Sequence, residues 1–203
     1  PIPGGANARP FITHHNALSD DFYLRIAPEL YLKRLIVAGF ERVYEINRNF
    51  RNEGVSLRHN PEFTMLEYYM TYHDYKFAMS FVEDLMRDAI QKSCGSLECQ
   101  YGYYIIDFEK PFERLSPKDA VIKYGNLNVT DLSEDSIDKT LKKHKIEIDS
   151  GASIHRKIFA LFEELAEKNI KDPVFIVDFP IEISPLAKRD PDKPNIASRF
   201  ELF

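Results

Sequence analysis

A predicted β-hairpin with one polar face places the strongest constraint on how this chain folds. Residues 41–53 alternate between apolar and polar side chains, and residues 62–72 read as a return strand. The segment EGVSLRHNP between them contains the Gly, Asn and Pro that are typical of turns. Two strands joined in this way are expected to pair as an antiparallel hairpin.

Each strand of this hairpin has one polar face, because successive side chains point to opposite sides of a strand. In the first strand that face carries Glu45, Asn47, Asn49, Arg51 and Glu53. In the return strand one face carries Phe63, Met65, Glu67 and Tyr69. If the two faces coincide, Arg51 and Glu53 near the turn share one concavity with Glu67, Tyr69 and Phe63 of the return strand.

Such a face has the chemistry of a ligand site. Arg51 can grip a carboxylate or a phosphate through two parallel hydrogen bonds, and a phenylalanine near the turn can stack on a flat heterocycle. Glu67, deeper in the hairpin, is a costly buried charge unless a cation meets it. A purely structural ion pair from Arg51 to Glu53 or Glu67 is the alternative, but it leaves Tyr69 and His59 without a role. The pattern therefore favours a ligand site.

The remaining elements predict an α+β fold. Pro28 and Gly39 bracket the predicted helix ELYLKRLIVA, and apolar residues recur at helical spacing in YKFAMSFVEDLMRDAIQKSC. Short strands are predicted at YYIIDF and PVFIVDFP. The character of the chain changes near residue 116, where polar helical segments begin. We therefore expect three parts: residues 1–115 with the hairpin, residues 116–172 as a helical insertion, and residues 173–203 as a return to the main sheet.

Composition excludes several classes of protein. The 203 residues are 44% hydrophobic and 29% charged, as in an ordinary globular chain, and the net charge of −5 argues against nucleic-acid binding by bulk electrostatics. No apolar run approaches the roughly 18 residues of a membrane span. Cys94 and Cys99, separated by four residues, form neither a zinc pattern nor a disulfide framework. Reduced thiols indicate a cytoplasmic protein.

The stretch FRNEGVSLRHNPEFTMLEYY resembles motif 2 of the class II aminoacyl-tRNA synthetases, in the form carried by lysyl-tRNA synthetases. The resemblance extends through IPGGANARPF, LRIAPELYLKRLIVAGFERVYEINRNFRNE, FPIEISPLAK and RFELF, and so covers nearly the whole chain. It implies an antiparallel β-sheet flanked by helices, with motif 1, motif 3 and the anticodon-binding domain absent. It also implies a ligase that activates lysine with ATP and transfers it to tRNA-Lys, with Mg²⁺ as cofactor.

The resemblance assigns roles to individual residues. Arg51 is implied as the catalytic arginine that holds the lysine carboxylate and the α-phosphate of ATP together. The implied ATP contacts are Arg51, Asn52, Glu53, His59, Asn60, Phe63 and Glu201. The implied lysine contacts are Gly5, Glu29, Arg51, Glu67 and Tyr69. Glu201 is also implied as the ligand of a Mg²⁺ ion that bridges the ATP phosphates.

The same resemblance implies the partners: ATP, L-lysine and tRNA-Lys, with a homodimeric parent enzyme and no membrane. The chain begins without Met and ends within RFELF, so we expect a fragment that is inactive alone. Two other functions stay open. One is a lysine ligase for elongation factor P with the same fold, against which IAPELYLKR and FPIEISPLAK argue. The other is a module that binds ATP or lysine without catalysis.

Overall fold

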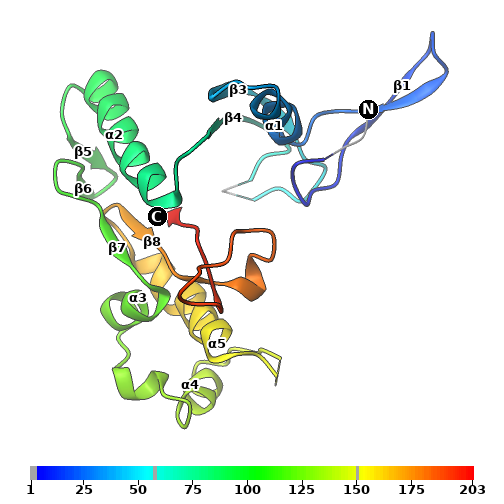
Figure 1. The fold of residues 1–203 in the computed structure, drawn as a ribbon. Coiled ribbons are helices and arrows are strands. Elements are labelled where there is room, and N and C mark those ends of the chain that lie inside the picture. The colour runs from blue at the N-terminus through cyan, green and yellow to red at the C-terminus, as the bar shows by residue number, and fades with distance from the viewer. Residues whose placement is uncertain (1–3, 57–58, 150) are drawn as a thin grey trace. The chain divides into compact units, whose positions relative to one another are not determined.

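The computed structural model describes residues 4–56, 59–149 and 151–203. The chain groups into two compact units, Pro1–His73 and Asp74–Phe203, and the described strands pair in small sheets that are mostly antiparallel (Figure 1). The predicted mixture of helices and antiparallel strands is confirmed. Within the described residues, no helix is long and apolar enough to cross a membrane.

The first unit consists of two hairpins and one helix. Its elements are β1 (Ile12–His15), β2 (Asp20–Tyr23), α1 (Glu29–Val37), β3 (Arg42–Phe50) and β4 (Glu62–Met70). Helix α1 packs against the β3–β4 hairpin (Figure 1). Pro28 occupies the N-cap position of α1, and Gly39 follows the helix with a φ of 100°. A left-handed residue after a helix is most easily a glycine, so the predicted start and stop signals of this helix are confirmed.

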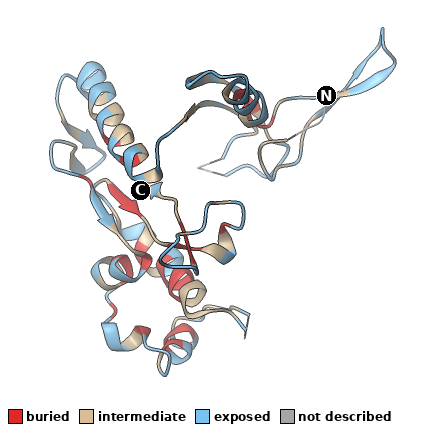
Figure 2. Ribbon diagram, in the orientation of Figure 1, coloured by how far each residue is buried: buried red, intermediate tan, exposed pale blue. Residues whose placement is uncertain are grey.

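The register of the hairpin shows that the two predicted faces coincide. Glu45 is the direct cross-strand partner of Glu67, and Asn49 is the partner of Phe63. Side chains of directly opposed residues lie on the same face of an antiparallel pair. This face is the more protected one, because the exposed residues of β3 alternate with half-buried or buried ones (Figure 2). The apolar face is the open one: Tyr44 is 72% exposed.

The second unit contains more helices. Its strands are β5 (Glu98–Tyr101), β6 (Tyr104–Asp107), β7 (Glu113–Leu115), β8 (Val174–Ile176), β9 (Phe179–Pro180), β10 (Ile196–Ala197) and β11 (Glu201–Leu202). Its α-helices are α2 (Tyr75–Cys94), α3 (Pro117–Tyr124), α4 (Ile137–Lys143) and α5 (Ile154–Leu161). Short 3-10 turns lie at Val129–Leu132, Glu167–Asn169 and Ile181–Ile183. The helix predicted over YKFAMSFVEDLMRDAIQKSC coincides with α2.

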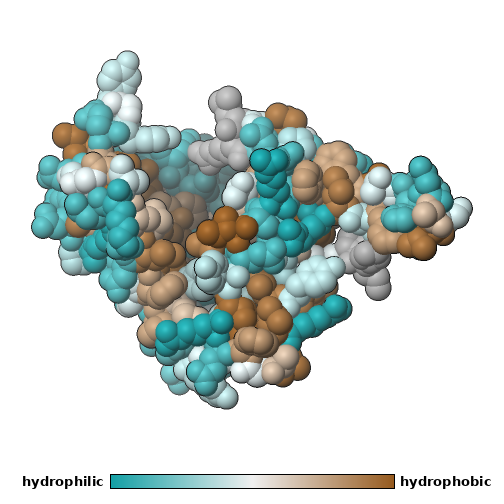
Figure 3. Space-filling model, turned by 90° about the horizontal axis from the view of Figure 1, so that it is seen from above, coloured by the Kyte–Doolittle hydropathy of each residue, from teal (hydrophilic) through white to brown (hydrophobic). Residues whose placement is uncertain are grey.

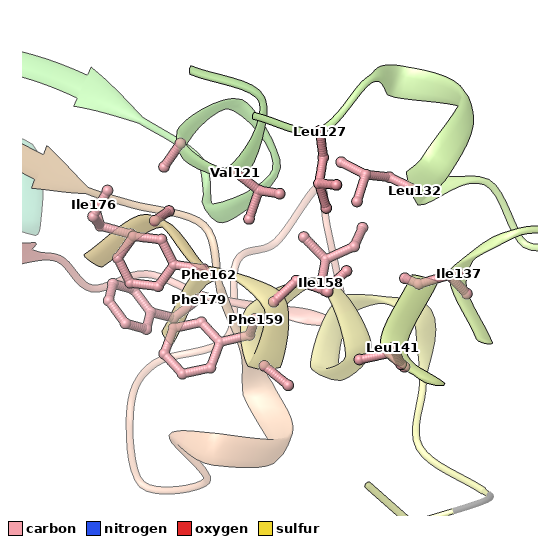
Figure 4. Packing of buried hydrophobic residues seen from close by; sticks show 14 of the residues in the cluster. Val121, Leu127, Leu132, Ile137, Leu141, Ile158, Phe159, Phe162, Ile176 and Phe179 are labelled. Carbon is pink, nitrogen blue, oxygen red and sulfur yellow. The ribbon is translucent and has the colours of Figure 1, made fainter. Parts of the chain in front are cut away.

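The main core of this unit lies between α3, α4, α5 and the strand segment that carries β8 and β9. The rings of Phe159 and Phe179 lie 5.4 Å apart between their centroids, and those of Phe159 and Phe162 lie 5.7 Å apart (Figure 4). Hydrophobic residues also reach the surface of the molecule, in patches between hydrophilic ones (Figure 3). The segment predicted as a helical insertion thus shares its core with the strands that follow it.

The helix predicted over SIHRKIFALFEELAEKNI is interrupted. Helix α5 passes into a π-helical turn, Phe162–Ala166, and then into the 3-10 turn. The side chain of Asn169 donates hydrogen bonds to the carbonyl oxygens of Tyr124, at 2.9 Å, and Leu165, at 2.8 Å. The bond to Tyr124 ties the end of this helical segment to the last residue of α3.

The strand order β11–β8–β7 places the C-terminal segment beside β8. Strand β8 pairs with β11 in the antiparallel direction and with β7 in the parallel direction. Glu201 is opposite Ile176 in this register. The strand predicted at RFELF is therefore present, in a three-stranded sheet of the second unit.

Candidate functional site

A cavity of about 500 Å³ lies at the turn end of the β3–β4 hairpin. Its lining consists of Arg51, Glu53, Gly54, His59, Asn60 and Phe63. Five of these six residues were predicted from the sequence as nucleotide contacts, and all six belong to the first unit. The fold therefore gathers this part of the predicted site around one hollow.

Arg51 is held in place by two contacts. Its Nε donates to the carbonyl oxygen of Ile26 at 3.3 Å, and its guanidinium carbon lies 5.1 Å from the centroid of the Phe63 ring. The backbone N–H of Arg51 donates to Pro61 at 2.8 Å, which closes the hairpin beyond the end of β3. The Nε contact leaves the two terminal nitrogens of the guanidinium able to donate to a ligand. A pair of such donors suits a carboxylate or a phosphate.

The segment after Arg51 is tied to the N-terminal part of the unit. The N–H of Asn52 donates to the carbonyl oxygen of Arg9 at 2.7 Å, and the N–H of Arg9 donates to the Glu53 carboxylate at 3.4 Å. These bonds fix the orientation of Glu53 beside the cavity. The Asn52 contact uses its backbone, and its side chain does not line the cavity.

His59 is oriented by a local turn. Ser56 and His59 form an isolated β-bridge, and the Ser56 hydroxyl lies 2.9 Å from His59 Nδ1. This contact leaves Nε2 of His59 available on the cavity side. The two residues flank positions 57 and 58 of the turn, which lie outside the described residues.

A second group of polar side chains lies farther along the hairpin. The hydroxyl of Tyr69 donates to the Glu67 carboxylate at 2.5 Å. Burial, the hydrogen bond to Glu67 and the negative charges of Glu67 and Glu29 raise the pKa of the Tyr69 phenol well above its usual range. Tyr69 is therefore a neutral donor, and the charge of Glu67 stays uncompensated by it.

Helix α1 contributes Glu29 to this group. Lys33, one turn later, forms an ion pair with Glu29, and its ammonium lies 5.7 Å from the centroid of the Tyr69 ring. Gly5 packs close to the start of the helix with a φ of 90°, and a Cβ there would come within 2.8 Å of Glu29 Cβ. The sequence predictions for Gly5 and Glu29 thus fall on neighbouring residues.

Four polar residues at or beside this face, Arg25, Glu45, Asn47 and Asn49, were given no individual role from the sequence. Arg25 donates to the Glu45 carboxylate at 2.6 Å, from the segment that precedes α1. The side-chain amides of Asn47 and Asn49 are buried and have no hydrogen-bond partner within the described residues. An unpaired buried amide costs about 1–3 kcal/mol, so this face has capacity for hydrogen bonds to a guest. The register of the hairpin, with Glu45 opposite Glu67, is the sequence signal that could have revealed them.

Glu201 belongs to the second unit, whereas the other predicted site residues belong to the first. Its carboxylate is bound by the guanidinium of Arg199. The described residues contain no group of three or more His, Cys, Asp or Glu side chains that could hold a metal ion. A single carboxylate that already has a cationic partner does not make a Mg²⁺ site, so the described residues do not by themselves fit this ion.

Comparison with known proteins shows the family of the chain. The model of the family "tRNA synthetases class II (D, K and N)" matches residues 1–203. The chain is 54% identical over 205 residues to a lysine–tRNA ligase of Actinobacillus pleuropneumoniae. It is 53% identical over 206 residues to one of Haemophilus influenzae, and 54% identical over 206 residues to one of Yersinia enterocolitica.

These matches cover the chain completely and the relatives in part. All of the chain is aligned in each case, whereas 41% of the first two relatives and 40% of the third are covered. The chain therefore spans about two fifths of the length of the curated lysine–tRNA ligases that it matches.

Proposed function

This chain belongs to the class II tRNA synthetases (D, K and N), and we propose that it is part of the catalytic domain of a lysine–tRNA ligase. The enzyme activates lysine with ATP and then transfers the lysyl group to tRNA-Lys. The observation that carries this proposal is the Glu67–Tyr69 pair, 2.5 Å apart, on the protected face of the hairpin. A carboxylate whose neighbour is a neutral phenol has charge left for a guest cation.

The hairpin and helix α1 together offer a partner for each charge of lysine. Arg51 binds the α-carboxylate, Glu29 receives the α-ammonium, and Glu67 with Tyr69 receives the ammonium at the end of the side chain. Glu29 must then share or give up its contact with Lys33. Gly5 leaves space beside Glu29 because it has no side chain. The buried amides of Asn47 and Asn49 supply further polar surface.

ATP occupies the cavity at the turn end of the hairpin. The adenine ring stacks on Phe63, its amino group donates to Glu53, and His59 and Asn60 contact the nucleotide from the turn. Asn52 is not among the residues that line this cavity, so its proposed contact with ATP lies outside the lining. Arg51 lines this cavity, and its guanidinium has donors enough to hold the lysine carboxylate and the α-phosphate side by side.

In the first step, a carboxylate oxygen of lysine attacks the α-phosphorus of ATP. A bond forms between these atoms, the bond to the bridging oxygen breaks, and pyrophosphate leaves with the electron pair. Arg51 is the catalytic residue, because it neutralises charge on both reacting groups and holds them in line. In the second step, a terminal hydroxyl of tRNA-Lys attacks the lysyl carbonyl and AMP leaves. No step is assigned to Mg²⁺ or to Glu201.

This site selects lysine by charge. A buried ammonium or carboxylate that has lost its partner costs on the order of 3–5 kcal/mol, so neutral amino acids of similar size are strongly rejected. Ornithine differs by one methylene, which is worth only about 1–3 kcal/mol, and is rejected less well. The proposed enzyme therefore discriminates more strongly against amino acids without a side-chain cation than against those whose cation is on a shorter side chain.

The test is ATP–pyrophosphate exchange by the full-length gene product that contains these 203 residues. We expect exchange that depends on lysine and is not supported by methionine or glutamine at the same concentration. A calorimetric titration with lysine and with ATP runs in parallel. Binding of both ligands without exchange would identify a binding module, and transfer of lysine to elongation factor P in place of tRNA would identify the related protein ligase.

A further inference from the structure

Two glutamates face each other across the β3–β4 hairpin. Glu45 and Glu67 are direct cross-strand partners, on the face that also carries the Tyr69 phenol. Side chains in this position have Cβ atoms about 4.5–5.5 Å apart, and like charges there destabilise the pair. Other groups must therefore relieve the repulsion between these two carboxylates.

Their partners are of different kinds. Glu45 accepts a charge-assisted hydrogen bond from the guanidinium of Arg25 at 2.6 Å. Glu67 accepts from the neutral hydroxyl of Tyr69, and within the described residues no cationic side chain lies at ion-pair distance from it. One carboxylate is thus neutralised by the protein, and the other keeps its charge.

Arg25 is well placed for this task, because its segment is fixed to the hairpin at two further points. The carbonyl oxygen of Arg25 accepts from the N–H of Phe50 at 2.7 Å. The next carbonyl, that of Ile26, accepts from Arg51 Nε at 3.3 Å. The segment that supplies the guanidinium for Glu45 therefore also supports the proposed catalytic arginine.

Stability alone does not account for this ion pair. The side chains of Arg25 and Glu45 are 37% and 33% exposed, and an ion pair at such a site contributes little to stability because solvent screens it. Its larger effect is on the neighbouring charge. If Glu45 were neutral, the Arg25 guanidinium would lose its ion-pair partner and could turn to Glu67, which is opposite Glu45 in the hairpin, where it would compete with any guest cation.

We propose that the Arg25–Glu45 ion pair is a specificity determinant that reserves the charge of Glu67 for the side-chain ammonium of the amino-acid substrate. This inference rests on the proposed function and adds two positioning residues to it. Neither residue touches the substrate in this account. Arg25 and Glu45 act by holding each other, so that the pocket offers one free negative charge at this depth.

A double-mutant cycle tests the proposal in the full-length gene product, with the Michaelis constants for lysine and ATP measured by pyrophosphate exchange. Glu45→Gln should raise the lysine KM by at least about tenfold, because a released guanidinium opposes the substrate ammonium. The KM for ATP should change less than twofold, roughly the scatter expected for an uncoupled site. The double variant Arg25→Met/Glu45→Gln removes both charges and should restore the lysine KM to within about threefold of wild type.

The chain offers a matched control on the same hairpin. Arg48 and Glu62 form an ion pair of 3.0 Å on exposed side chains, and Glu62→Gln removes the same kind of group. We expect this variant to leave the lysine KM unchanged. If Glu45→Gln fails to fold, the variant Arg25→Met takes its place, because it removes the cation and leaves Glu45 charged. The pocket then has two negative charges, Glu45 and Glu67, without a cationic partner. The preference for lysine over ornithine should fall by roughly threefold or more.

The outcomes separate the two proposals. Wild-type protein that shows no lysine-dependent exchange overturns the proposed function, and the inference with it. Wild-type exchange with lysine, combined with a Glu45→Gln variant that behaves like Glu62→Gln, overturns the inference alone. The inference also fails if the double variant is as impaired as the single variant, because the two residues would then act independently.

Discussion

The guanidinium of Arg51 covers one face of the Phe63 ring, with 5.1 Å between the guanidinium carbon and the ring centroid. The two residues come from opposite sides of the turn, and both line the same cavity. A cation over an aromatic face is attracted by the ring quadrupole. Phe63 therefore orients the arginine that is proposed to carry the reaction, and its ring is the surface proposed for adenine.

Replacement of Phe63 by Leu should weaken ATP binding. Stacking of a base on an aromatic ring is worth about 1–3 kcal/mol, so the KM for ATP in pyrophosphate exchange should rise by roughly 5- to 150-fold. The KM for lysine should change much less. Thr64→Ala, at the neighbouring exposed position, is the control. An unchanged KM for ATP would exclude Phe63 as the adenine platform.

Arg51→Lys should lower the rate of adenylate formation although it keeps the positive charge. A lysine ammonium cannot form two parallel hydrogen bonds or stack on Phe63 in the manner of a guanidinium. The loss expected for one preorganised charge-stabilising group is about 10²–10³-fold in kcat. Single-turnover measurement of adenylate formation separates this step from product release. A rate within a few-fold of wild type would remove Arg51 from its catalytic role.

Glu67→Gln should abolish the preference for a substrate with a side-chain cation. The variant keeps the shape of the side chain and a group that can hydrogen-bond to Tyr69, but it removes the charge that faces the guest. With a cost on the order of 3–5 kcal/mol for an unpaired ammonium, kcat/KM for lysine should fall by roughly 10²–10³-fold or more. Glu62→Gln, on the exposed face, is the matched control. Retention of lysine selectivity in Glu67→Gln would refute the charge argument.

Gly5→Ala should impair lysine binding through Glu29. The φ of 90° at this position is unfavourable for alanine, and the added Cβ would lie 2.8 Å from Glu29 Cβ. Glu29 would have to shift, and its carboxylate would move with it. We expect a higher KM for lysine and an ATP KM close to that of wild type. Gly39→Ala is a useful comparison, because Gly39 also has a positive φ, of 100°, but a Cβ there meets nothing within 4 Å.

The sequence was most informative where local signals and long-range packing agree. Alternation around EGVSLRHNP predicted the β3–β4 hairpin and its shared polar face, and Pro28 with Gly39 predicted the limits of α1. These features depend on the alternation of polar and apolar side chains and on the backbone conformations that Pro and Gly prefer. Both can be read from residues that are close together in the sequence. The roles assigned to individual site residues came from the resemblance to a family and stay predictions.

What the sequence could not supply depends on contacts between distant segments. The ion pair of Arg25 with Glu45 and the tie of Arg9 to the Asn52–Glu53 segment join residues that are 20 or more positions apart. The bond from Asn169 to the carbonyl oxygen of Tyr124 ties the end of the helical segment after α5 to another helix, 45 positions away. Tertiary contacts of this kind override local helix propensity and leave no periodic signal in the sequence.

Tyr69 should make the stability of the protein more sensitive to alkaline pH. Its pKa is raised in the folded state, mainly by burial and then by Glu67, so the folded protein keeps the phenolic proton where the unfolded chain loses it. The resulting stabilisation is complete below the unfolded pKa of about 10 and declines as the pH rises above it. Urea denaturation between pH 8 and 11 should therefore show a shallower decline for Tyr69→Phe than for wild type. Tyr44→Phe, at an exposed position of the same hairpin, should follow the wild-type curve, and identical pH dependence in all three proteins would contradict the assignment of a protected phenol to Tyr69.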